Sequence, residues 1–246
     1  MKYCVIGLGV FGRNLCKHLT GLGAEVLAVG ENEATVNSIK DDVSQALLVQ
    51  YTDLETLKQL DLSSMDAIFV AMGTDFEASM TITMLALAAR TESKKQTLKV
   101  YARALSGTHQ KLLELMGVDR IVVPEESAAR SLAHAVMVSG ALNGYDLGDG
   151  HIVIEAKVPE TFIGKSLKDL SAQFDDYKVL LVTIKRKSGA LTTAMAKTMF
   201  GNGISENEIL HKTLGRPRPN WTFEAGDVLV LMGPEKGLRG FLTLKD

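Results

Sequence analysis

The sequence predicts an α/β protein with a doubly wound parallel sheet and a second, smaller α+β domain. Two observations support the parallel sheet. Short β-branched runs alternate with amphipathic helical stretches over the first half of the 246 residues, which is typical of βαβ units. A glycine-rich hexapeptide also joins the first strand candidate to the first helix candidate. The pattern changes after about residue 146, which indicates the second domain.

Six strand candidates are sufficient for the parallel sheet. They are short and apolar, and lie at residues 2–6, 25–29, 44–50, 67–71, 98–102 and 120–122. Helical spacing of apolar residues is found between them, at residues 11–22, 32–39, 54–60, 76–90 and 109–116. Each of these stretches is long enough for a right-handed crossover between parallel strands. We therefore expect strands and helices to alternate through this part of the chain.

A further helix is predicted from Glu125 to about residue 139. Its broad apolar surface consists of Ala128, Ala129, Leu132, Ala133, Ala135, Val136 and Met137. Residues 140–150 contain four glycines, and this stretch is interpreted as a connection between domains. The sequence thus predicts a first domain at residues 1–125, a crossover helix with a linker at 126–146, and a second domain at 147–246.

The second domain has the mixed pattern of a small α+β fold. Strands are predicted at residues 152–158, 178–186 and 227–232, and helices at 166–174 and 235–241. Residues 192–219 show little periodicity and are interpreted as a long excursion.

Charge and hydropathy exclude several classes of partner. The formal net charge is −2, without the basic patch that nucleic acid or an anionic membrane would attract. The longest apolar runs are far shorter than the ~20 residues that span a bilayer. Residues 1–6 enter a strand directly and leave no room for a signal peptide, so we expect a cytoplasmic protein without membrane insertion. Cys4 and Cys16 are interpreted as packed, reduced thiols.

The glycine-rich hexapeptide is a G-x-G-x-x-G motif formed by Gly7, Gly9 and Gly12, with Val10 and Phe11 before the last glycine. In such a motif the first glycine permits a tight turn, the second lets backbone N–H groups approach a diphosphate, and the third allows close helix packing. Glycine turns join many strands to helices, so the hexapeptide alone is a weak signal. Its position between a strand and a helix predicts a Rossmann-like nucleotide site.

The end of the second strand has an unusual sequence for such a site. An acidic residue usually accepts hydrogen bonds from the ribose hydroxyls at this position. Here the chain has Gly30 followed by Glu31. Glu31 reaches the ribose if the strand end bends; alternatively, Glu31 and Glu33 only favour the first turn of the next helix. No arginine follows at once to bind a 2'-phosphate, so an adenosine nucleotide without that phosphate is favoured.

Two further strand ends supply candidate ligand-binding residues. Ala71, Met72 and Gly73 would let a diphosphate or a second ribose lie close to the backbone, and a plain strand-to-helix turn is the alternative. Arg103 is predicted at the carboxyl edge of the sheet, where ligands bind in such folds. A solvated or salt-bridged arginine is the alternative.

Catalytic constellations are missing from the sequence. Five histidines are dispersed, and no Ser-His-Asp grouping, thiolate motif or metal-ligand spacing is found. The last 100 residues also offer no convincing proton donor for a dehydrogenase. We therefore expect the nucleotide to act as a signal in a protein that is not an enzyme. An NAD-dependent oxidoreductase and a free-standing nucleotide sensor are the alternatives.

Three segments together resemble the RCK (KTN) family. They are VIGLGVFG at residues 5–12, VAMGTDFEAS at 70–79 and MGVDRIVVPE at 116–125. The second domain adds looser matches to the family's C-terminal domain, with VPE at 158–160, IGKSL at 163–167 and EAGDVLV at 224–230. The resemblance covers essentially the whole chain and is strongest to the regulatory subunits of Trk and Ktr potassium transporters.

The resemblance implies a Rossmann domain that binds ATP, ADP or NAD(H), and dimers paired through the crossover helix. Such dimers build a ring, commonly an octamer, on a separate membrane subunit that translocates potassium, at the inner face of the cell membrane. Glu125 matches a family acid that helps to hold a divalent cation, Mg or Ca, at the dimer interface. Alternatively, Glu125 and Glu126 are only favourable charges at a helix N-terminus.

The chain departs from the family pattern at several positions. Ktr-type relatives have an arginine in the glycine loop that contacts the terminal phosphate, and here the residue is Val10. Gly30 replaces the ribose acid, and the polar residue after the third strand becomes Gln50, followed by Tyr51. ATP and ADP discrimination and adenosine recognition are therefore properties that the resemblance leaves open. Residues 192–219 are longer than the family loop, so contacts or a second ligand of the C-terminal domain are not carried over from the family either.

Overall fold

A computed structural model describes residues 1–93, 97–138, 140–187 and 211–243 of the chain. These residues form two compact units, Met1–Pro124 and Glu125–Asp246, and each unit is described by itself. Within the described residues, no helix is both long and apolar enough to cross a bilayer.

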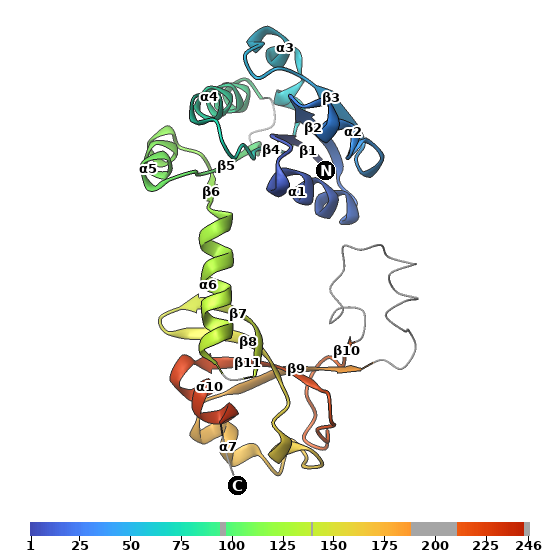
Figure 1. The fold of residues 1–246 in the computed structure, drawn as a ribbon, viewed down its shortest axis with the longest axis vertical. Helices are drawn as coiled ribbons and strands as arrows, with labels where there is room; N and C mark the ends of the chain where they lie inside the picture. Colours follow the sequence, from blue (N-terminus) through green and yellow to red (C-terminus); the bar gives the residue numbers. More distant parts are fainter. Residues whose placement is uncertain (94–96, 139, 188–210, 244–246) are drawn as a thin grey trace. The chain divides into compact units, whose positions relative to one another are not determined.

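The first unit contains a six-stranded parallel sheet with the order β3-β2-β1-β4-β5-β6 (Figure 1). Its strands are β1 (Lys2–Ile6), β2 (Glu25–Gly30), β3 (Gln45–Leu48), β4 (Ala67–Val70), β5 (Lys99–Arg103) and β6 (Arg120–Val122). Every neighbouring pair is parallel. The predicted doubly wound sheet is confirmed. The chain first builds outward from β1 through β2 to β3, then returns to the other side of β1 and builds outward through β4 and β5 to β6.

Helices connect these strands and cover both faces of the sheet. They are α1 (Val10–Gly21), α2 (Glu33–Asn37), α3 (Leu54–Gln59), α4 (Phe76–Glu92) and α5 (Gly107–Met116). Short 3-10 helices lie at Lys40–Asp42 and Leu62–Ser64. One core joins α1 and α2 to the sheet through Val5, Cys16 and Val36. A larger core joins α3, α4 and α5 to the opposite face, through Leu57, Ile82 and Leu113 among others.

Local sequence explains where four of these helices begin. Asn32, Asp53, Asp75 and Ser106 stand at the N-caps of α2, α3, α4 and α5, and each side chain accepts a hydrogen bond from a backbone N–H in the first turn. Such caps satisfy donors that a helix leaves unpaired at its start. α1 differs, because its N-cap is Gly9, which has no side chain to serve as a cap.

The two cysteines are buried and free, as predicted. Cys4 lies in β1 and Cys16 in α1. Burial raises the pKa of the Cys16 thiol to about 12 and that of Cys4 still further. Both thiols are therefore protonated at neutral pH and act as packing groups.

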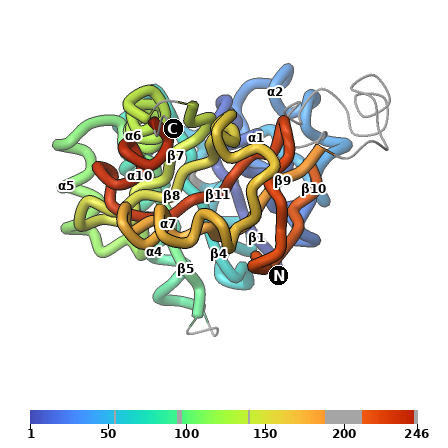
Figure 2. The backbone as a smooth tube through the Cα atoms, turned by 90° about the horizontal axis from the view of Figure 1, so that it is seen from below, coloured from blue at the N-terminus to red at the C-terminus, as the bar shows by residue number. Residues whose placement is uncertain are grey.

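The second unit contains a five-stranded antiparallel sheet with the order β10-β9-β11-β8-β7, in which β11 lies between β8 and β9 (Figure 2). Its strands are β7 (Ala141–Gly148), β8 (His151–Lys157), β9 (Leu180–Lys187), β10 (His211–Thr213) and β11 (Val228–Pro234). α6 (Pro124–Met137), α7 (Ser171–Asp176), α10 (Glu235–Leu242) and a 3-10 turn at Glu160–Phe162 complete the described elements. The predicted α+β architecture is confirmed.

The interpretation of residues 140–150 as a connection between domains is wrong. Residues Ala141–Gly148 form the edge strand β7, which pairs with β8 from Ala141 opposite Ala156 to Gly148 opposite His151. Gly144 lets this strand lie against α6, since an added Cβ would be 2.7 Å from His134 Cβ. The glycines therefore permit close packing and a tight hairpin turn, and the pairing register shifts twice along the strand.

Two other expectations for the second unit need correction or restriction. The helix expected at residues 166–174 begins only at Ser171. Before it, the backbone N–H and the hydroxyl of Ser166 both donate to the Asp169 carboxylate and form a turn. Most of the excursion expected at residues 192–219 lies outside the described residues. Its described end contains β10, a strand that the sequence did not predict.

Aromatic packing forms the centre of the second unit. The ring of Phe241, in α10, lies 5.1 Å from that of Phe162 and 4.6 Å from that of Phe174. Gly240 lets α10 lie close to Tyr177, because an added Cβ would be 2.4 Å from the Tyr177 ring. Buried residues of β8, β9 and β11 complete the core.

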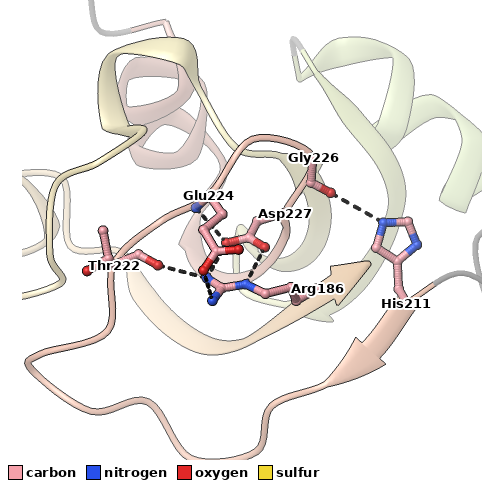
Figure 3. A network of polar contacts seen from close by, with 6 residues as sticks. All are labelled: Arg186, His211, Thr222, Glu224, Gly226 and Asp227. Carbon is pink, nitrogen blue, oxygen red and sulfur yellow. Dashed lines mark hydrogen bonds and ion pairs between the residues drawn. The ribbon is translucent and has the colours of Figure 1, made fainter. Parts of the chain in front are cut away.

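A charged network holds the start of β11 to β9 (Figure 3). The guanidinium of Arg186 donates from Nε and Nη2 to the two carboxylate oxygens of Asp227, at 2.9 and 2.8 Å. It also donates to the carbonyl of Thr222 at 2.7 Å and to the Glu224 carboxylate. Asp227 is only 1% exposed. The positive charge of Arg186 therefore offsets the cost of burying the Asp227 carboxylate.

Candidate functional site

The candidate site lies at the carboxyl edge of the parallel sheet, where β1 and β4 are neighbours. From this point the chain order runs outward through β2 and β3 on one side and through β5 and β6 on the other. The loops after β1 and β4 therefore diverge to opposite faces, and a crevice at such a switch point is where open α/β sheets bind ligands. Most of the predicted site residues lie in loops at this edge.

Gly7 and Gly12 are required by the fold itself. Gly7 has a φ of +106°, and an added Cβ would be 2.8 Å from Met72 N. At Gly12 an added Cβ would be 1.8 Å from the Gly7 carbonyl oxygen. A side chain at Gly7 would collide with the backbone of the loop after β4, and one at Gly12 would push α1 away from the end of β1. These two glycines therefore let the glycine loop pack closely against both.

Gly9 is different, because nothing in the described structure requires a glycine there. Its φ is −67°, which any residue adopts, and no atom lies within 4 Å of an added Cβ. Val10, the first helical residue, is 72% exposed, and the first turn of α1 carries no acidic side chain. The space beside Gly9 is open and the start of α1 has no side-chain cap, which suits a diphosphate bound at a helix start.

The loop after β4 completes one wall of the crevice. Ala71 and Met72 are buried beside the first turn of the glycine loop. Gly73 allows the Arg103 guanidinium to lie over the backbone, since an added Cβ would be 2.6 Å from Nη1. Arg103 also stacks over Phe11 at 6.0 Å from the ring centroid. The structure therefore brings Phe11, Gly73 and Arg103 together from three separate segments.

Gly30 lies at the end of β2, and Leu8 fills the space beside it. An added Cβ would be 2.8 Å from Leu8 Cδ1 and 3.2 Å from Val36 Cγ2. Glu31 follows as an exposed residue and precedes the Asn32 cap of α2. Two roles were predicted for Glu31, ribose binding and a favourable charge in the first turn of α2, and both remain predictions.

Three residues around the crevice were not among the predicted site residues. Leu8 occupies the space next to Gly30, Gln50 donates from Nε2 to the Glu31 carbonyl at 3.3 Å, and Tyr51 is buried beside the same loops. Leu8 stands at a variable position of the glycine motif, so the motif carries no signal for it. Gln50 and Tyr51 follow β3, and the sequence marks them only as a departure from the family's polar residue at this strand end.

Glu125 belongs to the second unit, where it is the second residue of α6. Among the described residues, no group of three or more His, Cys, Asp or Glu side chains is placed to hold a metal ion. The cation role of Glu125 remains a prediction. His109 is buried and packs against Phe76, and burial lowers its pKa.

Known proteins share this sequence pattern. The TrkA-N domain family matches residues 3–124. Ktr system potassium uptake protein C of Bacillus subtilis is 32% identical over 195 residues, covering 79% of this chain and 85% of the relative. Ktr system potassium uptake protein A of Vibrio alginolyticus is 29% identical over 238 residues, covering 96% and 94%. The solved structure described as "GsuK channel bound to NAD" has a TM-score of 0.58 at 15% identity.

The fold and the glycine loop define a Rossmann-type domain joined to a small antiparallel α+β domain. The GsuK likeness covers 99% of this chain but only 39% of the channel, and at this identity it shows the fold alone. The chain belongs to the TrkA-N (RCK) family, as the resemblance indicated. The expectation that it is not an enzyme is confirmed by relatives that are potassium-uptake proteins.

Proposed function

We propose that this chain is the nucleotide-binding regulatory subunit of a potassium uptake system, located at the cytoplasmic face of the membrane. The observation that carries the proposal is the match to Ktr proteins over almost the full length of both chains. The partner is a separate membrane subunit of the Trk or Ktr type that translocates potassium. The regulatory chain supplies the ligand-binding switch.

The proposed ligand is ATP, ADP or NAD(H), bound at the carboxyl edge of the parallel sheet. The open space above Gly9 and the uncapped start of α1 support a diphosphate at this position. Arg103 lies beside Gly73 and over the ring of Phe11, where a cation would contact an anionic ligand. The NAD-bound state of the GsuK channel agrees with a dinucleotide in this fold.

In this proposal the nucleotide acts by binding two states of the assembly with different affinity. Dimers of the chain build a ring, an octamer by the family resemblance, and the bound nucleotide sets the angle between paired Rossmann domains. A divalent cation held by Glu125 near the nucleotide would stabilise one of these states. The ring transmits the difference to the membrane subunit.

The pairing surface in this proposal is the exposed face of α6. No residue of this helix is buried, and Ala129, Leu132, Ala133 and Val136 follow the i, i+3, i+4, i+7 spacing of a single face. Val136 is 74% exposed and Leu132 is 64% exposed. An exposed apolar stripe of this kind is typical of a surface that another chain covers.

Polar replacement on α6 is therefore expected to weaken the dimer. Ala133→Asp together with Val136→Asp should lower the mass measured by light scattering at micromolar concentration, while the far-UV circular dichroism stays unchanged. Leu22→Asp, at an exposed leucine after α1, is the matched control and should leave the mass unaltered. An unaltered mass for the α6 variant would place the pairing surface elsewhere.

Titration calorimetry tests the proposed function directly. The purified chain is titrated with ATP, ADP, NAD and NADH, with and without magnesium or calcium, and its mass is measured by light scattering. Cation-dependent binding of ATP or ADP to a large ring supports the gating role. Binding of NAD(H) alone to a small dimer, followed by hydride transfer, would contradict it. A pull-down that recovers no membrane protein would also count against it.

A further inference from the structure

At the adenosine end of the candidate site, the second strand ends in Gly30 where a dinucleotide fold usually has an acid, and the Glu31 carboxylate comes one position later. The structure shows that position 30 cannot simply be given one. Leu8 is 3% exposed, and its Cδ1 atom lies 2.8 Å from where a Cβ at Gly30 would be. An acid at this position would have to displace a buried side chain of the glycine loop.

Gln50 reaches the same place from the neighbouring strand. The end of β3 is held beside β2 by the hydrogen bond from Val49 N to the Gly30 carbonyl, at 2.9 Å. From there the Gln50 side chain crosses the end of β2 and donates from Nε2 to the Glu31 carbonyl, at 3.3 Å. Its amide therefore lies over the residue that follows Gly30.

The orientation of this amide follows from its partner. A backbone carbonyl only accepts hydrogen bonds, so the Gln50 group that faces Glu31 is the NH2 group. The Oε1 atom of Gln50 is then presented as an acceptor, and it takes no hydrogen bond from any residue that the structure describes. Gln50 is exposed, so this acceptor is open to a ligand.

Tyr51 fixes the surroundings of this amide. Tyr51 is buried in the core that also contains Val29 and Val49, and burial raises its pKa to about 12. The residue after Gln50 is therefore anchored in the core beside the ends of β2 and β3.

We propose, on the basis of the nucleotide-binding function above, that Gln50 Oε1 replaces the acid absent from position 30 as the acceptor for a ribose hydroxyl. Gln50 is then a specificity-determining residue. A neutral acceptor contributes less than a charged one, and loss of one neutral hydrogen bond corresponds to about a fivefold change in Kd.

Calorimetry with ADP, 2'-deoxy-ADP and 3'-deoxy-ADP tests this assignment on wild type and Gln50→Ala. Gln50→Ala is expected to weaken ADP binding about fivefold and to leave the Kd of one of the two deoxy analogues unchanged, because the bonded hydroxyl is already missing from that analogue. Gln59→Ala, at an exposed glutamine of α3, is the control and should change none of the affinities.

Several outcomes would overturn the assignment. Equal losses for ADP and both deoxy analogues, or no loss at all, would show that Gln50 does not bond the ribose. A loss for ADP without a loss for GDP would assign Gln50 to the base. If wild type binds no adenosine nucleotide, the proposed function fails together with this inference, whereas binding without a deoxy-dependent difference overturns this inference alone. Thermal melting followed by circular dichroism confirms that each variant is folded.

Discussion

Replacing Gly9 with aspartate is expected to abolish nucleotide binding while the chain stays folded. The backbone at Gly9 has an ordinary φ, and space for a side chain is open. A carboxylate there would stand where the diphosphate approaches the start of α1. Two like charges about 4 Å apart repel by about 4 kcal/mol near a protein surface, so we expect the affinity to fall at least ~100-fold.

Calorimetry with the nucleotide that wild type binds measures this loss, and circular dichroism checks the fold. Gly21→Asp is the matched control, because Gly21 ends the same helix and also has open space for a side chain. That variant should bind as wild type does. Unchanged affinity in Gly9→Asp would remove the diphosphate from the glycine loop and, with it, the central assignment of the site.

Replacing Arg186 with leucine is expected to destabilise the second unit by about 3 kcal/mol. The substitution removes both hydrogen bonds to the buried Asp227 carboxylate and the one to the Thr222 carbonyl. A buried carboxylate without its cation is more costly than a missing pair, because its desolvation is no longer offset. Urea denaturation of the full chain, followed by Trp221 fluorescence, measures the loss.

A second substitution separates this charge effect from lost packing. Adding Asp227→Asn to Arg186→Leu removes the uncompensated charge and should recover a large part of the stability. Arg218→Leu, at an exposed arginine of the same unit, should leave the denaturation midpoint unchanged. If the double variant were as unstable as Arg186→Leu, packing of the arginine stem and not the buried charge would explain the loss.

Much of the first unit could be predicted because its signals are local. Each strand of the parallel sheet is a short apolar run, and each is followed by a stretch with helical spacing, so the order of elements is visible without knowledge of the contacts. The helix caps Asn32, Asp53, Asp75 and Ser106 act within three residues of their own position. The glycine motif likewise places a turn between two neighbouring elements.

The second unit was predicted less completely because its signals depend on distant partners. Residues 140–150 read as a linker by their four glycines, yet Ala141–Gly148 is a strand because β8 supplies the hydrogen bonds. β10 is only three residues long and depends on pairing with β9. In both cases the composition alone does not favour a strand, and the tertiary partner decides the structure.

The sequence by itself determined the fold class, the family and the position of the glycine loop, because each of these depends on residues that are close together in the chain. Only the tertiary structure decided what surrounds the loop. Leu8 fills the space beside Gly30, and Gln50 reaches Glu31 from another strand. These contacts join residues about 20 positions apart, and the parallel pairing of β2 with β3 and β1 brings them together.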